Sequence, residues 1–291
     1  MITVGLSISL SPDLAALGFG PVHLQDAMVE FARYLLARGD RIAYGGDPQT
    51  SRFSQILVDL VRTHHRASAA PGERVASYLA CHVWAGLSTS DRIRLKDAAQ
   101  LVEVPPPPDL GAGAAGDPGA RATPYFKARC MSAMRERMTQ EIDARVVLGG
   151  KLAGYKGLHP GVAEEAYLAL RSGKPLYLLG AFGGGARAVI EALRGGAPPA
   201  LTAEGRDALA GHRELADAYR SHGRHEEADR DLIAFFGGAG VRGLQNGLTD
   251  AENEALFDAD DIHEMIALVL KGLSALPAAG GPLDPIQTAA R

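Results

Sequence analysis

The sequence has few of the residues that adapt a protein to an oxidising or membrane environment. Its 291 residues include two cysteines, Cys81 and Cys130, and no apolar run long enough to span a bilayer. The first residues lack the basic segment of a secretory signal peptide. The two cysteines have no metal-ligand spacing. We therefore expect a cytoplasmic protein without a metal site, a cofactor or a membrane partner.

An excess of basic charge is also absent. Lys and Arg number 30 against 34 Asp and Glu, which gives a formal net charge of −4 and an isoelectric point near 6.1. Such a chain offers no basic surface for nucleic acid, so no nucleic-acid partner is expected. Hydrophobic residues at 46% and charged residues at 22% are ordinary for a globular protein that buries a substantial core.

Short apolar segments alternate with amphipathic segments of helical length through much of the chain. The expected strands are 2–9, 40–47, 75–86, 144–150 and 174–180, and the expected helices are 24–39, 51–65, 125–142, 161–173 and 185–195. This alternation predicts right-handed βαβ units. It indicates a Rossmann-like α/β fold, with a mostly parallel open sheet flanked by helices.

The alternation also predicts how the chain is divided. It dissolves between about 86 and 124, where Pro, Gly and Ala are abundant, and 103–122 is expected to be a flexible loop. We expect the sheet domain over 1–197 and a helical extension over 198–275, followed by a disordered tail over 276–291.

Glycines gather at the ends of the predicted strands. They include Gly5, Gly45, Gly46, Gly86, Gly149, Gly150 and Gly180. In a parallel sheet these ends meet at one edge where ligands bind, and glycine lets the backbone approach a ligand closely. The clustering suits a nucleotide or a phosphorylated sugar, although βα turns use glycine in any case. No G-x-G-x-x-G segment follows the first strand and no Walker A loop is present, which argues against a dinucleotide dehydrogenase and an ATPase.

Charged residues flank the double glycine that ends strand 144–150. Arg135 and Arg137 lie on the helix before this strand, and Glu164 and Glu165 lie in the first turns of the helix after it. The arginines either clamp a phosphate or belong to a solvated helix face. One of the adjacent carboxylates either faces the cleft and binds ribose hydroxyls, or the pair merely complements the helix macrodipole.

Other polar residues lie near the strand ends or occur in groups. Ser7, Ser9, Lys151, Tyr155 and Lys156 are candidates for phosphate or hydroxyl contacts, or else are ordinary turn and surface residues. The groups are Cys81-His82 beside Trp84, His64-His65 at a helix end, and His222 with His225 and Glu226. The first group suits base stacking or core packing, and the second suits the helix dipole. The third has near-ligand spacing within a segment typical of a solvated surface.

Two runs of the sequence, RERMTQEIDARVVLGGK and GVAEEAYLALRSGKPLYLLGAFGGGARAVIEAL, resemble the SLOG superfamily. Its members include the LOG phosphoribohydrolases, the DprA/Smf proteins and nucleotide-sensing domains of bacterial conflict systems. The resemblance covers about 125–195 and implies roles for a helix arginine, a glycine strand end, an acidic turn and a Lys-Pro strand. These roles fall to Arg135 or Arg137, Gly149-Gly150, Gly161 with Glu164 and Glu165, and Lys174-Pro175.

Within that superfamily the sequence is more similar to the sensor branch. Lys151 and a long glycine-containing loop replace the PGG-x-GT segment of the hydrolases. We expect a nucleotide-derived ligand of the ADP-ribose type, or another phosphoribosyl compound, at the strand ends. The expected ligand contacts are Ser7, Gly45, Gly46, Arg135, Arg137, Gly149, Gly150, Lys151, Gly161, Glu164 and Glu165.

The alternative is a LOG-like enzyme that cleaves the N-glycosidic bond of a nucleoside monophosphate. Its catalytic residues would be Glu164, Glu165 and Arg137, with a glutamate stabilising the ribosyl cation and the arginine orienting the substrate. Under either interpretation, the superfamily relatives imply a homo-oligomer.

Overall fold

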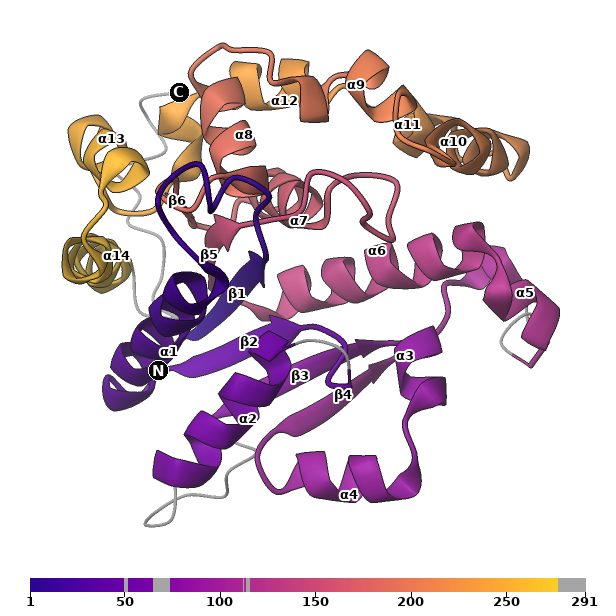
Figure 1. Ribbon diagram of the computed structural model, residues 1–291, viewed down its shortest axis with the longest axis horizontal. Helices are drawn as coiled ribbons and strands as arrows, with labels where there is room; N and C mark the ends of the chain where they lie inside the picture. Colours follow the sequence, from indigo (N-terminus) through magenta and orange to yellow (C-terminus); the bar gives the residue numbers. More distant parts are fainter. Residues whose placement is uncertain (50–51, 65–73, 112, 114–115, 277–291) are drawn as a thin grey trace, which may run out of the picture.

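The computed structural model describes residues 1–49, 52–64, 74–111, 113 and 116–276. It contains an open sheet of six parallel strands in the order β4-β3-β2-β1-β5-β6 (Figure 1). The strands are β1 (Thr3–Ser9), β2 (Arg41–Gly45), β3 (Val75–Ala80), β4 (Gln100–Val104), β5 (Ala144–Gly149) and β6 (Leu176–Leu179). The predicted Rossmann-like α/β architecture is therefore confirmed.

The order of the strands places a topological switch point between β1 and β5. The chain builds the sheet outward from β1 to β4, then returns to add β5 and β6 on the other side of β1. Ser9, the last residue of β1, is in register with Gly149, the last residue of β5. In open α/β sheets the crevice for a ligand forms beyond the carboxyl ends of such a strand pair.

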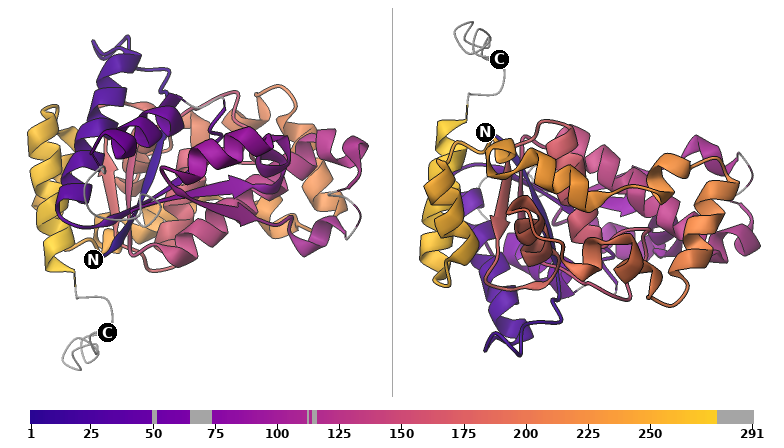
Figure 2. Two further views of the ribbon diagram at one scale, coloured as in Figure 1. Left: turned by 90° about the horizontal axis from the view of Figure 1, so that it is seen from below. Right: turned by 90° about the horizontal axis from the view of Figure 1, so that it is seen from above.

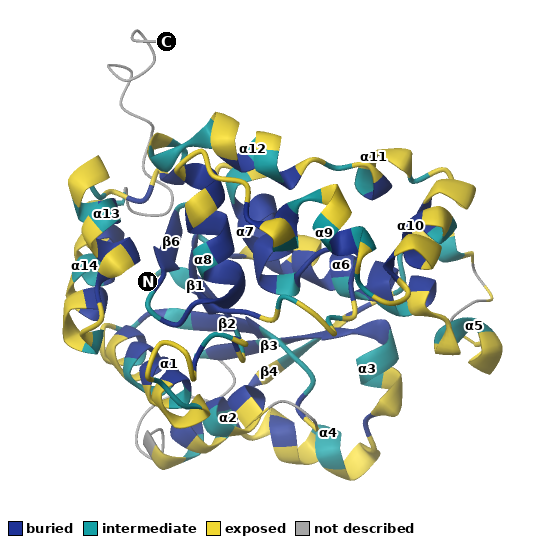
Figure 3. Ribbon diagram, turned by 45° about the horizontal axis from the view of Figure 1, so that its top comes forward, coloured by how far each residue is buried: buried dark blue, intermediate teal, exposed yellow. Residues whose placement is uncertain are grey.

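Helices cover both faces of the sheet (Figure 1). One face packs against α1 (Pro21–Ala37), α2 (Arg52–His64) and α14 (Ile262–Ala275), and the other against α6 (Pro124–Glu141), α7 (Gly161–Arg171) and α8 (Gly184–Leu193). Successive side chains of β5 alternate between these layers: Val146 packs with α1, whereas Val147 packs with α7 and α8. Figure 3 shows the strands as mostly buried, with exposed residues on the outer helices.

The segment predicted as an irregular connection has its own elements. The strand expected over 75–86 ends at Ala80, and α3 (Cys81–Gly86) follows directly. Beyond it lie α4 (Thr89–Lys96), β4, a 3-10 turn at Pro108–Leu110 and α5 (Pro118–Ala122). The prediction missed them because β4 is an edge strand of five residues, of which Gln100 and Glu103 are exposed, and because α4 is mostly polar.

The last helices pack against the sheet domain. They are α9 (Ala203–Asp207), α10 (His212–Ser221), α11 (His225–Ala228), α12 (Leu232–Ala239), α13 (Asp250–Asp258) and α14. Met265 and Val269 of α14 share a core cluster with β1 and α1, and Figure 2 shows α14 alongside α1. Within the described residues no helix is both long and apolar enough to cross a bilayer. His65 and the expected tail, apart from Leu276, lie outside those residues.

Candidate functional site

A cavity of about 350 Å³ opens at the switch point, beyond the ends of β1, β2 and β5. It is lined by several predicted ligand residues. These are Ser9, Gly45, Gly46, Arg135, Lys151, Tyr155, Lys156, Gly161 and Glu165. The lining also includes residues that were not predicted as ligand contacts: Tyr44, Asp47, Arg52, Phe53 and Met131. The strand-end cavity therefore joins residues from the first half of the chain to the acidic turn of α7.

Arg135 connects the two carboxylates of the acidic turn. Its Nη1 donates to Oε2 of Glu164 at 2.5 Å, and its Nε lies 3.6 Å from Oε1 of Glu165. Oγ of Ser132 donates to the second oxygen of Glu164, also at 2.5 Å. All of these side chains are buried. Of the two interpretations that the sequence left open, an exposed pair that merely complements the helix dipole does not hold, because both side chains are buried and pair with arginines.

A second arginine, Arg145 of β5, completes this cluster and was missed by the sequence analysis. It is fully buried, and its Nη1 donates to Oε2 of Glu165 at 3.2 Å and to Oγ of Ser7 at 2.7 Å. Its Nη2 donates to Oγ1 of Thr139 at 2.9 Å. Burial lowers the pKa of the Arg145 guanidinium, and the charge of Glu165 opposes that shift. Two arginines thus face two glutamates in a buried cluster without net charge.

Two glycines lie beside these arginines. A Cβ at Gly161 would lie 2.5 Å from Nη2 of Arg135, and one at Gly5 would lie 3.6 Å from Cζ of Arg145. Gly5 is also in register with Arg145 on the neighbouring strand. Gly161 therefore leaves room for the Arg135 guanidinium, whereas the tight contact at Gly5 is with Cδ1 of Ile142 at 2.8 Å.

The double glycine does not line the cavity, although both residues were predicted ligand contacts. It forms the turn that leads into the cavity. Gly149 and Gly150 have φ values of +64° and +116°, which favour glycine. A Cβ on Gly150 would meet Gly185 of α8 at 3.0 Å, so the turn packs tightly against that helix. The turn then directs Lys151 toward the cavity, where its backbone N–H donates to Oγ of Ser9 at 3.1 Å.

Hydrogen-bond donors dominate the rim of the strand-end cavity. Lys151 and Lys156 are exposed, and Arg135 of α6 also lines the cavity. The N-terminus of α7 has no side-chain cap. Burial raises the pKa of Tyr155 to about 12, so its hydroxyl keeps its proton at neutral pH. Within the described residues that hydroxyl has no hydrogen-bond partner. Cations beside an uncapped helix N-terminus favour an anionic ligand.

Comparison with protein families gives a match to the family described as SLOG cluster2 over residues 1–256. The chain belongs to the SLOG cluster2 family. No curated protein and no solved structure matches the sequence. The match confirms the SLOG resemblance seen in the sequence. It runs past residue 197, the expected end of the sheet domain, and takes in α9 to α12.

The helices after residue 197 hold one wall of the cavity of this SLOG chain. Arg206 donates to Nδ1 of His159 at 2.6 Å, and Nε2 of His212 lies 3.0 Å from the carbonyl oxygen of Leu158. Both contacts anchor the loop that carries Lys151, Tyr155 and Lys156. Because Arg206 can only donate, neutral His159 carries its proton on Nε2. Burial and then Arg206 lower the pKa of His159 well below its ordinary value.

Some predicted contacts lie outside the SLOG cavity. Arg137 is exposed and pairs with Glu141 on its own helix, so it does not reach the strand ends. Ser7 and Glu164 lie behind the lining and bind Arg145 and Arg135. Ser7 and Glu164 therefore hold Arg145 and Arg135 in place and do not line the cavity themselves.

The histidine groups of the SLOG chain have other surroundings. His222 stacks on Tyr125 with ring centroids 4.2 Å apart, and His225 begins α11. Among the described residues, the one group with metal-ligand geometry is Cys81, His82 and Cys130, rather than His222, His225 and Glu226. Cys81 and Cys130 form a disulfide, which the sequence spacing did not suggest. Burial, with Lys156 and Lys127, lowers the pKa of His82 to about 4.

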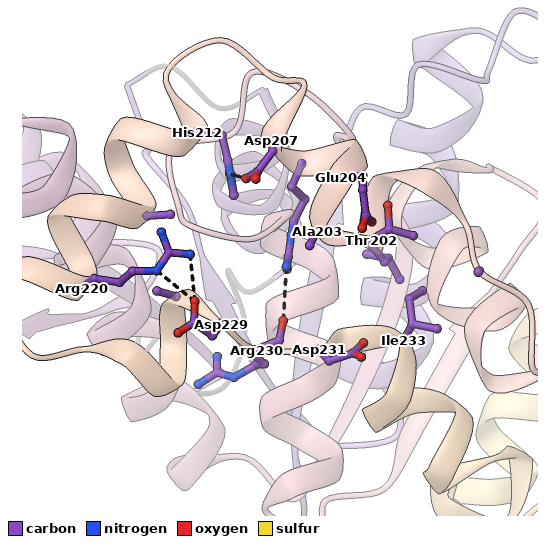
Figure 4. Close-up of a pocket in the computed structure, with 15 residues that line it drawn as sticks. Thr202, Ala203, Glu204, Asp207, His212, Arg220, Asp229, Arg230, Asp231 and Ile233 are labelled. Carbon is purple, nitrogen blue, oxygen red and sulfur yellow. Dashed lines mark hydrogen bonds and ion pairs between the residues drawn. The ribbon is translucent and has the colours of Figure 1, made fainter.

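A second cavity, of about 430 Å³, lies among α9 to α12 (Figure 4). Some of its charged residues pair with one another: Arg220 donates to Oδ1 of Asp229 at 2.8 Å, and Nδ1 of His212 lies 3.0 Å from Oδ1 of Asp207. It shares no lining residue with the strand-end cavity. Glu204 and Arg230 also line it, and no ion pair of either is found among the described residues. This cavity lies away from the glycine-rich strand ends where the sequence predicts a ligand.

Proposed function

We propose that this SLOG protein binds a nucleotide-derived ligand, of the ADP-ribose type or another phosphoribosyl compound, in the strand-end cavity and acts as a sensor. The observation that carries the proposal is the position of Arg135, Lys151 and Lys156 around the uncapped N-terminus of α7. A phosphate group there would meet two exposed lysines, the guanidinium of Arg135, which is already paired with Glu164 and Glu165, and the free N–H groups of the helix. Membership of the SLOG family supports a ligand at this edge of the sheet.

The remaining lining suits the other parts of such a ligand. Tyr44 and Phe53 supply aromatic surface, and the unpartnered hydroxyl of Tyr155 supplies a donor. Glu165 supplies carboxylate oxygens that can accept from ribose hydroxyls. A ligand with phosphate, ribose and a flat base matches this combination of cations, carboxylate and aromatic rings.

The charge balance of the buried cluster favours binding over glycosidic hydrolysis. Stabilising a ribosyl cation needs a carboxylate whose charge is directed at the sugar. Both oxygens of Glu165 lie near arginines, and Glu164 is bound by Arg135 and Ser132. Arg137, the expected orienting residue, lies outside the cavity. We therefore favour a sensor over a hydrolase as the function of this protein.

A thermal-shift screen with product analysis distinguishes the two functions. The full chain is mixed with ADP-ribose, nucleoside monophosphates and free ribose 5-phosphate, and each mixture is then resolved by chromatography. A sensor shows a raised melting temperature with ADP-ribose, which is recovered unchanged. Release of free base and ribose 5-phosphate from a monophosphate contradicts the sensor. No shift with any of these compounds contradicts ligand binding itself.

The expected homo-oligomer belongs to the same proposal. Light scattering of the chain with and without ADP-ribose measures its mass in both states. A mass of two or more times the 30.5 kDa of one chain supports self-association. A monomer under both conditions contradicts it.

A further inference from the structure

Packing of α3 against α6 brings three metal-binding side chains together. Cys81 is the first residue of α3, directly after β3, and Cys130 lies in the middle of α6. Their Cα atoms are 5.9 Å apart. The two sulfurs and a ring nitrogen of His82 lie within 4.8 Å of one another. This group is separate from the lining of the strand-end cavity.

The surroundings of His82 are not explained by the disulfide. Both of its ring nitrogens are buried, and within the described part of the chain neither has a hydrogen-bond partner. Buried polar atoms without a partner are uncommon and call for a specific explanation. An imidazole nitrogen that faces two sulfurs is a typical ligand of a transition metal.

The shell around the three side chains also suits a metal. Cys81 and Cys130 belong to a core cluster that contains Ala80, Phe126 and Met134. An apolar shell limits solvent access and strengthens the binding of a cation by thiolates. His82 itself is only partly buried, which leaves a path for an ion from solvent.

We propose that Cys81, Cys130 and His82 form a Zn²⁺ site when the disulfide between the cysteines is reduced. Two thiolates with one imidazole select Zn²⁺ over Mg²⁺ and Ca²⁺, which prefer oxygen ligands. Around a tetrahedral zinc ion the ligand atoms stand roughly 3.3 to 3.8 Å apart. Water fills the fourth position.

The two states of the site exchange by a balanced reaction. A phosphine cleaves the S–S bond and takes the oxygen of a water molecule, becoming a phosphine oxide, while the two protons of that water go to the two sulfurs. Binding of Zn²⁺ then displaces both protons to the buffer as two sulfur–zinc bonds form. The same sulfurs therefore serve either the disulfide or the metal, never both at once.

Cobalt titration tests this site directly. The full chain is reduced with a phosphine, freed of excess reagent under anaerobic conditions and titrated with Co²⁺, whose complexes with thiolates give a charge-transfer band in the near ultraviolet. The expected result is a band that saturates at one equivalent and disappears when Zn²⁺ is added. The oxidised chain should give no band.

Single variants distinguish loss of a metal ligand from a general effect on the protein. Under reducing conditions Cys130→Ser should lose the charge-transfer band, and His82→Ala should weaken Co²⁺ binding at least about tenfold. His263→Ala removes an exposed histidine of α14 and should bind as the parent does. The proposal is overturned by the absence of a band in the reduced parent chain, by an equal band in the oxidised chain, or by unchanged binding in His82→Ala.

Discussion

Nε of Arg135 lies 3.6 Å from Oε1 of Glu165, and both side chains line the strand-end cavity. The same guanidinium binds Glu164 through Nη1. One arginine thus fixes the position of both carboxylates in the acidic turn and also offers charge to a ligand. The positions of Arg135 and Arg145 should control the stability of the site and its affinity.

Replacing Arg145 should destabilise the protein strongly. Arg145→Met leaves Glu165 without one of its two cationic partners in a fully buried cluster, and breaking such a pair costs about 3–5 kcal/mol. Arg137→Met is the control, because its salt bridge is on the surface and worth about 0–1 kcal/mol. Urea unfolding of both variants measures the difference. Equal losses would show that the buried cluster contributes nothing special.

Adding one methyl group at Gly161 should weaken ligand binding by displacing Arg135. The Cβ of Gly161→Ala would lie 2.5 Å from Nη2 of Arg135, so the guanidinium must shift within its cluster with Glu164 and Glu165. We expect an affinity loss for ADP-ribose of about tenfold, or about 1.4 kcal/mol. Gly86→Ala is the control, since a Cβ there meets no atom within 4 Å. Unchanged affinity in Gly161→Ala would argue against a role for Arg135 in binding.

Stability should fall as the pH drops below about 6.5, the ordinary pKa of histidine. Burial, and next Arg206, lower the pKa of His159 in the folded state, so the unfolded chain binds a proton that the folded chain does not. Below pH 6.5 protonation of His159 in the unfolded chain lowers the free energy of unfolding by up to about 1.4 kcal/mol per pH unit. Above that pH the contribution of His159 to the free energy of unfolding is constant. The lowered pKa of His82, about 4, acts in the same direction.

Urea unfolding at roughly pH 7.5 and 5.5 checks that dependence. His159→Gln keeps an acceptor for Arg206 and should reduce the loss of stability at the lower pH. His263→Ala, at an exposed position, should retain it. If His159→Gln loses as much stability on acidification as the parent, the histidine is not the source of the effect.

The disulfide between Cys81 and Cys130 should stabilise the oxidised chain. It closes a loop with a sequence separation of 49 residues, for which the chain-entropy relation gives about 4 kcal/mol. Reducing agent should therefore lower the free energy of unfolding of the parent chain measured without added metal. Cys130→Ser should show no such response. Identical stability of the parent with and without reductant would contradict the prediction.

Local signals in the sequence predicted much of the fold and part of the site. Gly45, Gly46 and the Lys151 loop line the cavity, and chain direction with sheet topology suffices to place them at the strand ends. Gly5 instead lies inside β1, and Gly86 ends α3. Arg135 and Arg137 stand about 200° apart around a helix, so only one can face the strand ends. The sequence left that choice open, and the structure selects Arg135.

The features that were missed depend on contacts between distant segments. Arg145 stands among apolar residues of β5, and its partners Ser7, Thr139 and Glu165 come from three other elements. A single arginine inside a buried strand was the available signal. The Cys81–Cys130 pair likewise depends on how α3 packs on α6, which no sequence spacing reveals.

Calorimetric titration with ADP-ribose tests the central claim most directly. The chain should bind one equivalent, and Lys151→Met combined with Lys156→Met should lower the affinity at least about tenfold, because each lysine would form a charged hydrogen bond to phosphate. Both lysines are exposed, so the fold should tolerate their loss. Lys96→Met, on exposed surface outside the cavity lining, should bind like the parent. Absence of binding to the parent, or equal affinity in the double variant, would contradict the account.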